Sequence, residues 1–329
     1  MKWFGFGFNG FGQIKPGRKD EEEGMRVLSP VALLDSLCTC AETFSRTGLS
    51  RKQKTETQKV VASWSRTAVI HRTAVCVCAG QRRWLCEPGV EEQEEEQQET
   101  EESLSGVENS TPLKRLAVSL ALGTGHAVLL AASGTVYTWG HGSHGQLGHG
   151  TLVSGDEPQA IEALWGVPMK SVAAGGWHSA CISAGGDLYV WGWNESGQIG
   201  LPSKGLREER PREESIEKDK LKGNKKEDEG TSDVFISIQA FPALVDLSEA
   251  AEIKKVSCGS RHTAAITSTG DLYTWGWGFY GQLGHGSRCS SDEPKIVEFF
   301  SGGGMSVEDV TCGLWNTFVS ADPRDRVAS

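Results

Sequence analysis

Three segments of the chain repeat one another closely, and this repeat constrains the fold more than any other feature. They cover residues 122–148, 172–200 and 256–284. Each has a short apolar stretch, a glycine turn, a second stretch that ends in Trp-Gly, and a loop that leads to Gly-Gln-(Leu/Ile)-Gly. A stretch, a tight turn and a second stretch predict a β-hairpin. Three such copies therefore predict an architecture built from one repeated sheet.

The spacing of the copies indicates the size of the repeating unit. His126 and His178 take the same place in two copies and lie 52 residues apart, whereas His178 and His262 lie 84 apart because residues 203–233 are inserted. A period of about fifty is too long for tetratricopeptide or ankyrin units and fits a four-stranded propeller blade. We therefore predict an all-β fold, a β-propeller of about five to seven blades.

Two further positions of the repeat fit a ring of blades. The tryptophan of the Trp-Gly pair has a large flat side chain that suits the wedge between adjacent blades. These tryptophans are Trp139, Trp191 and Trp275. We also expect one small residue per copy where the strands crowd toward the axis, at Ala127, Ala180 and Ala264.

The two ends of the chain complement each other. Residues 310–319 form an incomplete fourth copy with Asn316 at the histidine position, and residues 6–14 align without a gap with 191–199. Joined together, the two ends make one whole blade. Pairing of the N- and C-terminal strands would remove two open sheet edges, so we predict that this pairing closes the ring.

Composition supports this reading and limits what the charge means. The chain has 41 Gly and 11 Trp but only 4 Met, which favours short strands over long helices. The net charge of −10 comes largely from the Glu-rich stretch 91–102, so the folded part is nearly neutral and the charge neither predicts nor forbids a nucleic-acid partner. No stretch approaches the roughly 18 apolar residues that span a bilayer, so we expect a soluble intracellular protein with no membrane partner.

Residues 1–329 are predicted to form a single propeller domain with insertions. Residues 15–59 are either a degenerate blade or irregular chain, and 61–70 is a weaker copy with Arg66 at the histidine position. We expect a disordered acidic loop over 87–112, with histone binding as the functional alternative, and a disordered charged insertion over 203–233.

The motif resembles the regulator of chromosome condensation repeat, in which Gly-x-x-His-(Ser/Thr) is followed by Gly-x-(Val/Leu)-(Tyr/Phe)-x-Trp-Gly and Gly-Gln-Leu-Gly. The chain also resembles the short, domain-containing member of that family. The resemblance implies a propeller that serves as a docking surface in chromatin and small-GTPase biology. It also implies a Jumonji-C oxygenase, acting on histones or arginine side chains, as the protein partner. Histones or chromatin are further implied contacts, and the implied location is the nucleus and chromosomes, with the cytoplasm as a second compartment.

Catalytic, cofactor and metal sites are not predicted, so we expect a protein that is not an enzyme. The histidines at 126, 178 and 262 occupy one repeat position, which favours one structural job, bridging backbone groups, over a catalytic set. Zinc at Cys38, Cys40, Cys76 and Cys78 is the alternative, but the Cys-x-Cys spacing is tighter than a usual zinc knuckle. The glycine-rich loops precede no helix and so lack a phosphate site.

The leading functional hypothesis is a binding module that uses the loops at one end of the propeller. Aromatic residues and arginine are typical interface anchors, and the candidate contacts are Trp177, Trp193, Asn194, Glu195, Arg261, Trp277, Phe279 and Tyr280. The alternative is that these residues pack between neighbouring loops. The rival function is guanine nucleotide exchange on a Ran-like GTPase, although no wedge-like hairpin can be matched; a propeller hydrolase or lectin is a third class.

Overall fold

The computed structural model describes residues 2–9, 14, 26–32, 57–62, 66–71, 74–79, 82–85, 117–209, 234–247 and 251–324. For the strands between 57 and 85 only the backbone path is described. The acidic stretch 87–112 and residues 210–233 of the insertion lie outside the described residues, so the predictions made for them stay predictions.

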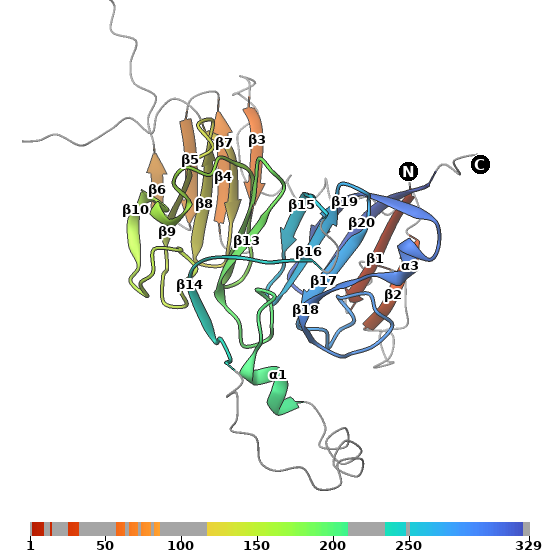
Figure 1. Ribbon diagram of the computed structural model, residues 1–329. Helices are drawn as coiled ribbons and strands as arrows, with labels where there is room; N and C mark the ends of the chain where they lie inside the picture. The colour runs from red at the N-terminus through yellow and green to blue at the C-terminus, as the bar shows by residue number, and fades with distance from the viewer. Residues whose placement is uncertain are drawn as a thin grey trace, which may run out of the picture.

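Five four-stranded antiparallel sheets make up the fold (Figure 1). We number them as blades 1 to 5 and give the strands of each in order from the axis outward. Blade 1 consists of β19 (Met305–Cys312), β20 (Asn316–Pro323), β1 (Lys2–Phe8) and β2 (Arg26–Ala32). Blade 2 consists of β3 (Thr57–Ala62), β4 (Arg66–His71), β5 (Ala74–Ala79) and β6 (Arg82–Leu85). The other three blades are formed by the three clear copies of the repeat.

Blade 3 consists of β7 (Ala117–Leu122), β8 (His126–Ala131), β9 (Val136–Gly140) and β10 (Gly155–Ala160). Blade 4 consists of β11 (Met169–Ala174), β12 (His178–Ser183), β13 (Leu188–Trp193) and β14 (Ile238–Leu244). Blade 5 consists of β15 (Ile253–Cys258), β16 (His262–Thr267), β17 (Leu272–Gly276) and β18 (Ser291–Ile296). The helices are short: η5 (Glu162–Leu164), α1 (Lys204–Glu209) and α3 (Glu298–Ser301).

Neighbouring blades contact each other through their inner strands. β7 packs against β4, β11 against β8, β15 against β12, and β19 against β16, so that blades 2, 3, 4, 5 and 1 follow one another (Figure 1). The predicted all-β propeller architecture is confirmed. The degenerate copy at 61–70 is the centre of blade 2, where Arg66 begins β4 just as His126 begins β8.

Blade 1 joins the two ends of the chain, as predicted. β1 lies between β2 and β20, with Phe6 opposite Thr317 and Gly7 opposite Asn316. The N- and C-terminal ends therefore lie together at one end of the blade (Figure 1). Phe6 is fully buried and packs in the cluster that fills the space between blades 5 and 1. A phenyl ring here replaces the indole rings of the other copies.

The seams between blades form the core. Trp191 and Trp275 are fully buried, whereas Trp139 is only partly buried. Each buried ring lies in a separate apolar cluster with side chains of the preceding blade, such as Val128 with Trp191. At about 150–250 Å² of buried surface per ring, these aromatic side chains contribute a large share of the apolar burial at their seams.

One prediction about the repeat was wrong by a single position. Ala127 pairs with Trp139, whereas the residues that pair with Trp191 and Trp275 are Ser179 and Thr263. Ala127 therefore corresponds to a hydroxyl residue in the next two copies and not to Ala180 and Ala264. The misalignment arose because the first copy has an alanine where its neighbours have a hydroxyl residue followed by an alanine.

A proline interrupts the outer strand of four blades, at Pro30, Pro158, Pro242 and Pro294. In each blade it lies where the pairing with the third strand shifts register. A proline offers no N–H for a ladder, and a shift in register bends the strand, so both features discourage another strand from adding to the edge. The outer edges of these blades are therefore poor docking sites for an extended peptide.

Among the described residues, no helix has the length and apolar character needed to cross a membrane.

The closure of blade 1 depends on Gly7, whose φ is +110°. A Cβ atom there would lie 2.6 Å from the Cα of Asn316 and the carbonyl oxygen of Trp315. We expect Gly7→Ala to lower the free energy of unfolding by about 3 kcal/mol, because backbone strain of roughly 1–2 kcal/mol adds to a clash with backbone. Gly166→Ala is the control: φ is +83° but the space around it is open, so only the strain remains. Urea unfolding measures both, and equal losses would contradict the role of Gly7.

Candidate functional site

A hydrogen-bonded relay crosses each of the three seams that join blades 3, 4, 5 and 1. The Nε2 atom of His126 lies 2.8 Å from Ser179 Oγ in the next blade, and Ser179 Oγ donates to the carbonyl oxygen of Gln146 at 2.8 Å. The relay recurs between blades 4 and 5, where His178 contacts Thr263, which donates to Gln198. Between blades 5 and 1 its members are His262, Thr317 and Gln282. The histidines thus reach the backbone of the Gly-Gln-(Leu/Ile)-Gly loop through a hydroxyl of the neighbouring blade.

The relay fixes the protonation of the histidines. A carbonyl oxygen only accepts, so each hydroxyl uses its hydrogen on the glutamine carbonyl and must accept from the Nε2–H of the imidazole. Burial lowers the pKa of His178 to about 3 and that of His262 to about 4, with the neighbouring histidines adding to the effect at His178. These rings are neutral at pH 7 and lie buried in the seams.

The indole N–H of the seam tryptophans binds the same carbonyl groups. Trp191 Nε1 donates to Gln146 at 2.9 Å, and Trp275 Nε1 donates to Gln198 at 3.1 Å. The ring of Phe6 takes this position in blade 1, packed on Gly284, and has no N–H to offer Gln282. The seam between blades 5 and 1 therefore lacks one hydrogen bond that the two preceding seams have.

The glutamine side chains hold the loops that lead to the exposed end of the blades. The Oε1 atoms of Gln146, Gln198 and Gln282 accept the backbone N–H of the residue two positions earlier. Asn194 holds its loop in a similar way: its amide donates to the carbonyl groups of Leu201 and Ile236, and its Oδ1 accepts from Ile199. These loops are thus fixed by internal bonds and present their remaining side chains in defined positions.

Two positions in each of blades 3, 4, 5 and 1 meet at the exposed end of the blades, the end where α1 lies in Figure 1. The residue after Trp-Gly donates its N–H to the carbonyl of the residue before the histidine position, at 2.8 or 2.9 Å. The pairs are His141 with Gly125, Trp193 with Trp177, Trp277 with Arg261, and Phe8 with Trp315. The repeat histidines beside them are buried in the seams, whereas the side chains at these positions are half-buried or, at His141, exposed.

These side chains and the loop residues beside them form two groups of ring contacts, joined by the backbone bond between Trp277 and Arg261, and together we call them the aromatic band. His144 lies 4.8 Å from Trp177 and 5.5 Å from Trp193, and the guanidinium carbon of Arg261 lies 4.5 Å from the ring centroid of Trp193. On the other side of Arg261, Trp277 lies 5.0 Å from Trp315 and 5.2 Å from Tyr280. The aromatic band consists of His144, Trp177, Trp193, Arg261, Trp277, Phe279, Tyr280, Trp315 and Phe8.

Six of the eight candidate contacts lie in this band. Glu195 is exposed on the same loop as Trp193 but takes no part in the ring contacts. Asn194 is fully buried, and its side chain forms hydrogen bonds to backbone groups. Asn194 therefore shapes the loop and does not reach the surface. The sequence reading missed His144, Trp315 and Phe8. The repeat alignment contained the signal for two of them, because Phe8 aligns with Trp193 and Trp315 with Trp177.

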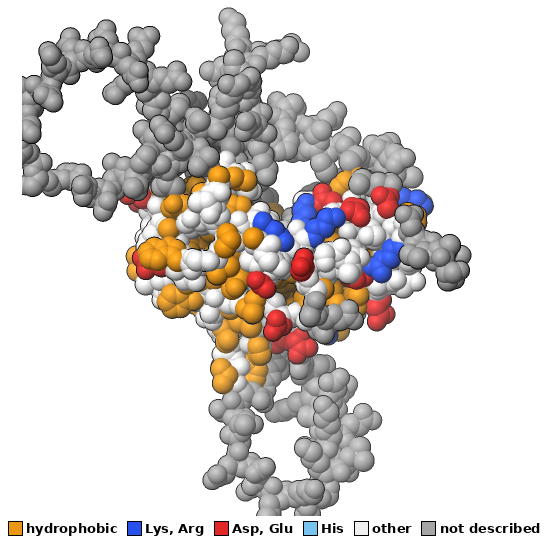
Figure 2. All heavy atoms as spheres, turned by 45° about the horizontal axis from the view of Figure 1, so that its top comes forward, with side chains coloured by type: hydrophobic (Ala, Val, Ile, Leu, Met, Phe, Trp, Pro, Cys, Tyr) orange, Lys and Arg blue, Asp and Glu red, His pale blue; other side chains and the backbone are white. Residues whose placement is uncertain are grey.

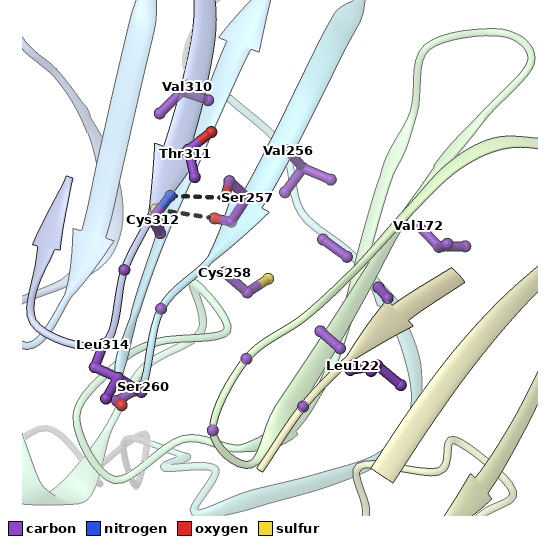
Figure 3. A pocket seen from close by; sticks show the side chains of 18 of the residues that line it. Leu122, Val172, Val256, Ser257, Cys258, Ser260, Val310, Thr311, Cys312 and Leu314 are labelled. Carbon is purple, nitrogen blue, oxygen red and sulfur yellow. Dashed lines mark hydrogen bonds between the residues drawn. The ribbon is translucent and has the colours of Figure 1, made fainter. Parts of the chain in front are cut away.

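A cavity of about 670 Å³ lies at the axis and is lined by β7, β11, β15, β19 and the loops that follow them (Figure 3). Its wall includes Cys312, whose N–H donates to Ser257 Oγ at 2.9 Å. Loss of hydration raises the pKa of Cys312 to about 12 and raises that of Cys258 well above its usual value. These thiols stay protonated and are poor nucleophiles.

The charged residues near the cavity are already paired. Lys255 in its wall bonds Asp309, and Lys254 bonds Glu308 at 2.8 Å. These pairs lie at the end of the blades where β15 and β19 begin, the end that Figure 2 brings forward and where blue and red side chains gather. Among the described residues, no group of three or more His, Cys, Asp or Glu side chains is arranged to hold a metal ion. The aromatic band, at the opposite end, is the stronger candidate for function.

A match to a known sequence repeat shows which protein family the chain belongs to. The regulator of chromosome condensation (RCC1) repeat matches residues 133–182, 185–266 and 269–320. This chain is a member of the RCC1 repeat family. A second model of the same repeat matches 117–146, 169–198 and 253–282.

Relatives of similar length exist within the RCC1 repeat family. The chain is 40% identical to RCC1 domain-containing protein 1 of Mus musculus, covering 98% of each chain. It is 39% identical to the protein of that name in Homo sapiens, covering 97% of this chain and 96% of the other. Among solved structures, Prp20p of Saccharomyces cerevisiae has a TM-score of 0.59 at 17% identity, covering 82% of this chain and 56% of that one. That crystal structure supports the propeller fold.

The low pKa values of the seam histidines predict a pH-dependent stability. In the unfolded chain each imidazole takes up a proton near pH 6.5, whereas His178 and His262 remain neutral in the fold until about pH 3 or 4. The free energy of unfolding should therefore keep its full value above pH 6.5 and fall as the pH drops toward 4. Urea midpoints at pH 7, 6 and 5 measure this, and His178→Gln should flatten the slope. His141→Gln, at an exposed histidine, is the control. An unchanged slope in His178→Gln would contradict the assignment.

The seam between blades 5 and 1 offers a gain of stability. We expect Phe6→Trp to add the missing indole donor to the Gln282 carbonyl and to raise the free energy of unfolding by about 1 kcal/mol. The matched destabilising variant is Trp191→Phe, which removes the hydrogen bond to Gln146 and should lower the free energy of unfolding by about 1–2 kcal/mol. Thermal unfolding of the two variants measures both effects. A destabilised Phe6→Trp variant would show that this seam is too tight for an indole ring.

Proposed function

We propose that this chain is a non-catalytic protein-binding module and that the aromatic band is its contact surface. The observation that carries the proposal is the band itself: aromatic rings and one arginine from blades 3, 4, 5 and 1, held at one end of the fold by bonded loops. Tryptophan, tyrosine and arginine are the side chains that most often dominate binding energy in protein interfaces. Because internal bonds fix these loops, little conformational entropy would be lost on binding.

Other parts of the surface support this choice of face. The outer edges of four blades carry a proline and a shift in register, which works against strand addition there. The opposite end carries lysine and arginine residues paired across blades 5 and 1 with Glu308, Asp309 and Asp271. Exposed ion pairs contribute little net attraction to a partner because they are already matched and solvated.

As the partner we propose a Jumonji-C oxygenase that acts on histones or arginine side chains, bound in the nucleus and influencing chromatin and mitotic chromosomes. The support is the 40% identity over 98% of both chains to RCC1 domain-containing protein 1 of mouse, together with the family resemblance read from the repeat. Histones and a Ran-like GTPase are the second class of partner. Prp20p, which shares the fold, was described with its binding properties to Gsp1p and histones.

The contact surface is tested by binding of a purified Jumonji-C oxygenase in isothermal titration calorimetry. We expect the double variant Trp277→Ala, Tyr280→Ala to weaken binding by 30-fold or more, the effect of losing a hot spot worth at least about 2 kcal/mol. Trp165→Ala is the control, because Trp165 is 65% exposed and lies outside the band. A folded double variant that binds as tightly as the unchanged protein would contradict the proposed face.

Release of labelled GDP from a Ran-like GTPase separates the binding module from an exchange factor. We expect no acceleration of release at micromolar concentrations of this chain. Acceleration that is lost in the band variant would favour the exchange function over the oxygenase partner. Acceleration retained in the band variant would in addition move the functional surface away from the band.

A further inference from the structure

Arg261 is the one arginine of the aromatic band, and its position is fixed from two sides. Its carbonyl oxygen accepts the N–H of Trp277 at 2.8 Å, in the pair that ends blade 5. Its guanidinium carbon lies 4.5 Å from the ring centroid of Trp193 in blade 4. A guanidinium stacked on an indole face keeps the N–H donors at its edge directed away from the ring. Arg261 is thus a half-buried charge with its binding edge oriented by the fold.

The described part of the chain supplies no carboxylate to this guanidinium. The ion pairs within that part are Lys254 with Glu308, Lys255 with Asp309, and Arg324 with Asp271, all at the opposite end of the blades. Glu195 is the exposed acid on the neighbouring loop, two residues after Trp193, and it does not lie within ion-pair distance of Arg261. Arg261 therefore differs from the paired cations of the fold in having its charge available to a ligand.

Apolar side chains adjoin Arg261 on one side. Trp277 is bonded to its backbone, and Trp277 in turn contacts Phe279, Tyr280 and Trp315. Phe279 is 43% exposed, so this ring cluster presents apolar surface to the solvent. An exposed apolar cluster beside an oriented guanidinium matches a ligand that carries a carboxylate next to an apolar side chain.

We infer that the aromatic band recognises an acidic-apolar peptide segment of its partner: an Asp or Glu carboxylate binds Arg261, and an adjacent Leu, Phe or Trp side chain packs on Trp277 and Phe279. This inference rests on the proposed binding function and names the chemistry of its ligand. A single fixed cation among aromatic rings does not suit a nucleic-acid backbone, which requires several phosphate contacts. A basic segment would be repelled by Arg261, and the aromatic band contains no Asp or Glu side chain to bind it.

Selection from a random twelve-residue peptide library displayed on phage, with the immobilised full-length chain as bait, tests the inference. We expect the selected peptides to be enriched in Asp or Glu within two positions of an aromatic or leucine residue. The Arg261→Glu variant should instead select Lys or Arg at that place. Selection of basic or uncharged peptides by the unchanged protein would overturn the inference. Failure to select any peptide whose binding is lost in the Trp277→Ala, Tyr280→Ala variant would also overturn it.

The charge contact itself is measured with the best selected peptide in fluorescence anisotropy. Arg261→Gln should weaken binding by at least 10-fold, and Arg261→Lys by less, because lysine keeps the charge but lacks the planar fork. Replacing the acidic residue of the peptide by its amide should weaken binding to the unchanged protein as much as Arg261→Gln does. The same peptide change should weaken binding to the Arg261→Gln variant little further. Arg324→Gln, at the opposite end, is the control and should bind normally. If the losses of affinity from Arg261→Gln and from the amide change in the peptide simply add, a direct contact between the two groups would be contradicted.

The outcomes separate this inference from the proposed function. Oxygenase binding that depends on Trp277 and Tyr280 but not on Arg261 would sink the acidic-ligand inference and leave the contact surface standing. Peptide selection that behaves as expected, with no oxygenase binding, would instead support the ligand chemistry and reject the proposed partner.

Discussion

The structure depends on the carbonyl group of one glutamine in each loop, which accepts a hydroxyl of the next blade and, at Gln146 and Gln198, an indole N–H as well. At Gln146 these donors are the hydroxyl of Ser179 and the indole N–H of Trp191, and the hydroxyl is in turn the acceptor for His126. All four groups are buried, so any one of them left without its partner would cost roughly 1–3 kcal/mol. The seam between two blades is therefore specified by polar groups as well as by the apolar surface around them.

The same seam chemistry determines what the exposed end of the fold can display. A histidine locked to the next blade fixes the residue before it, and a tryptophan locked to the preceding loop fixes the residue after its glycine. The backbone bond between these two flanking residues, such as that from Trp277 to Arg261, then sets their side chains next to each other. Rings from successive blades meet because each blade repeats this arrangement one step further around the axis. The band is thus a consequence of the way in which the blades are joined.

The repeat predicted the hairpins, the blade period and the joining of the two chain ends, because each of these is local to one copy or to an alignment of copies. The relay could not be predicted in the same way, since its members come from two blades and its hydroxyl stands one position after the histidine. That position was misassigned at Ala127, where the hydroxyl is missing. Asn194 was misread for a related reason: a polar residue in a loop suggests exposure, but here the backbone groups of Ile199, Leu201 and Ile236 bond its side chain. The second half of blade 2 gave no signal because β5 and β6 lack the Trp-Gly ending.

The internal copies also separate structure from function without any comparison to other proteins. Positions buried in the seams are nearly alike from copy to copy: histidine, then Ser or Thr except at Ala127, then glutamine in the loop. The position before the histidine varies among blades 3, 4, 5 and 1, with Gly125, Trp177, Arg261 and Trp315 on the same backbone geometry. Packing does not require this variety, since the sheet ends in the same way each time. A scaffold that repeats its buried residues and varies its exposed ones places its specificity in the varied set, and Arg261 is the one charged residue in that set.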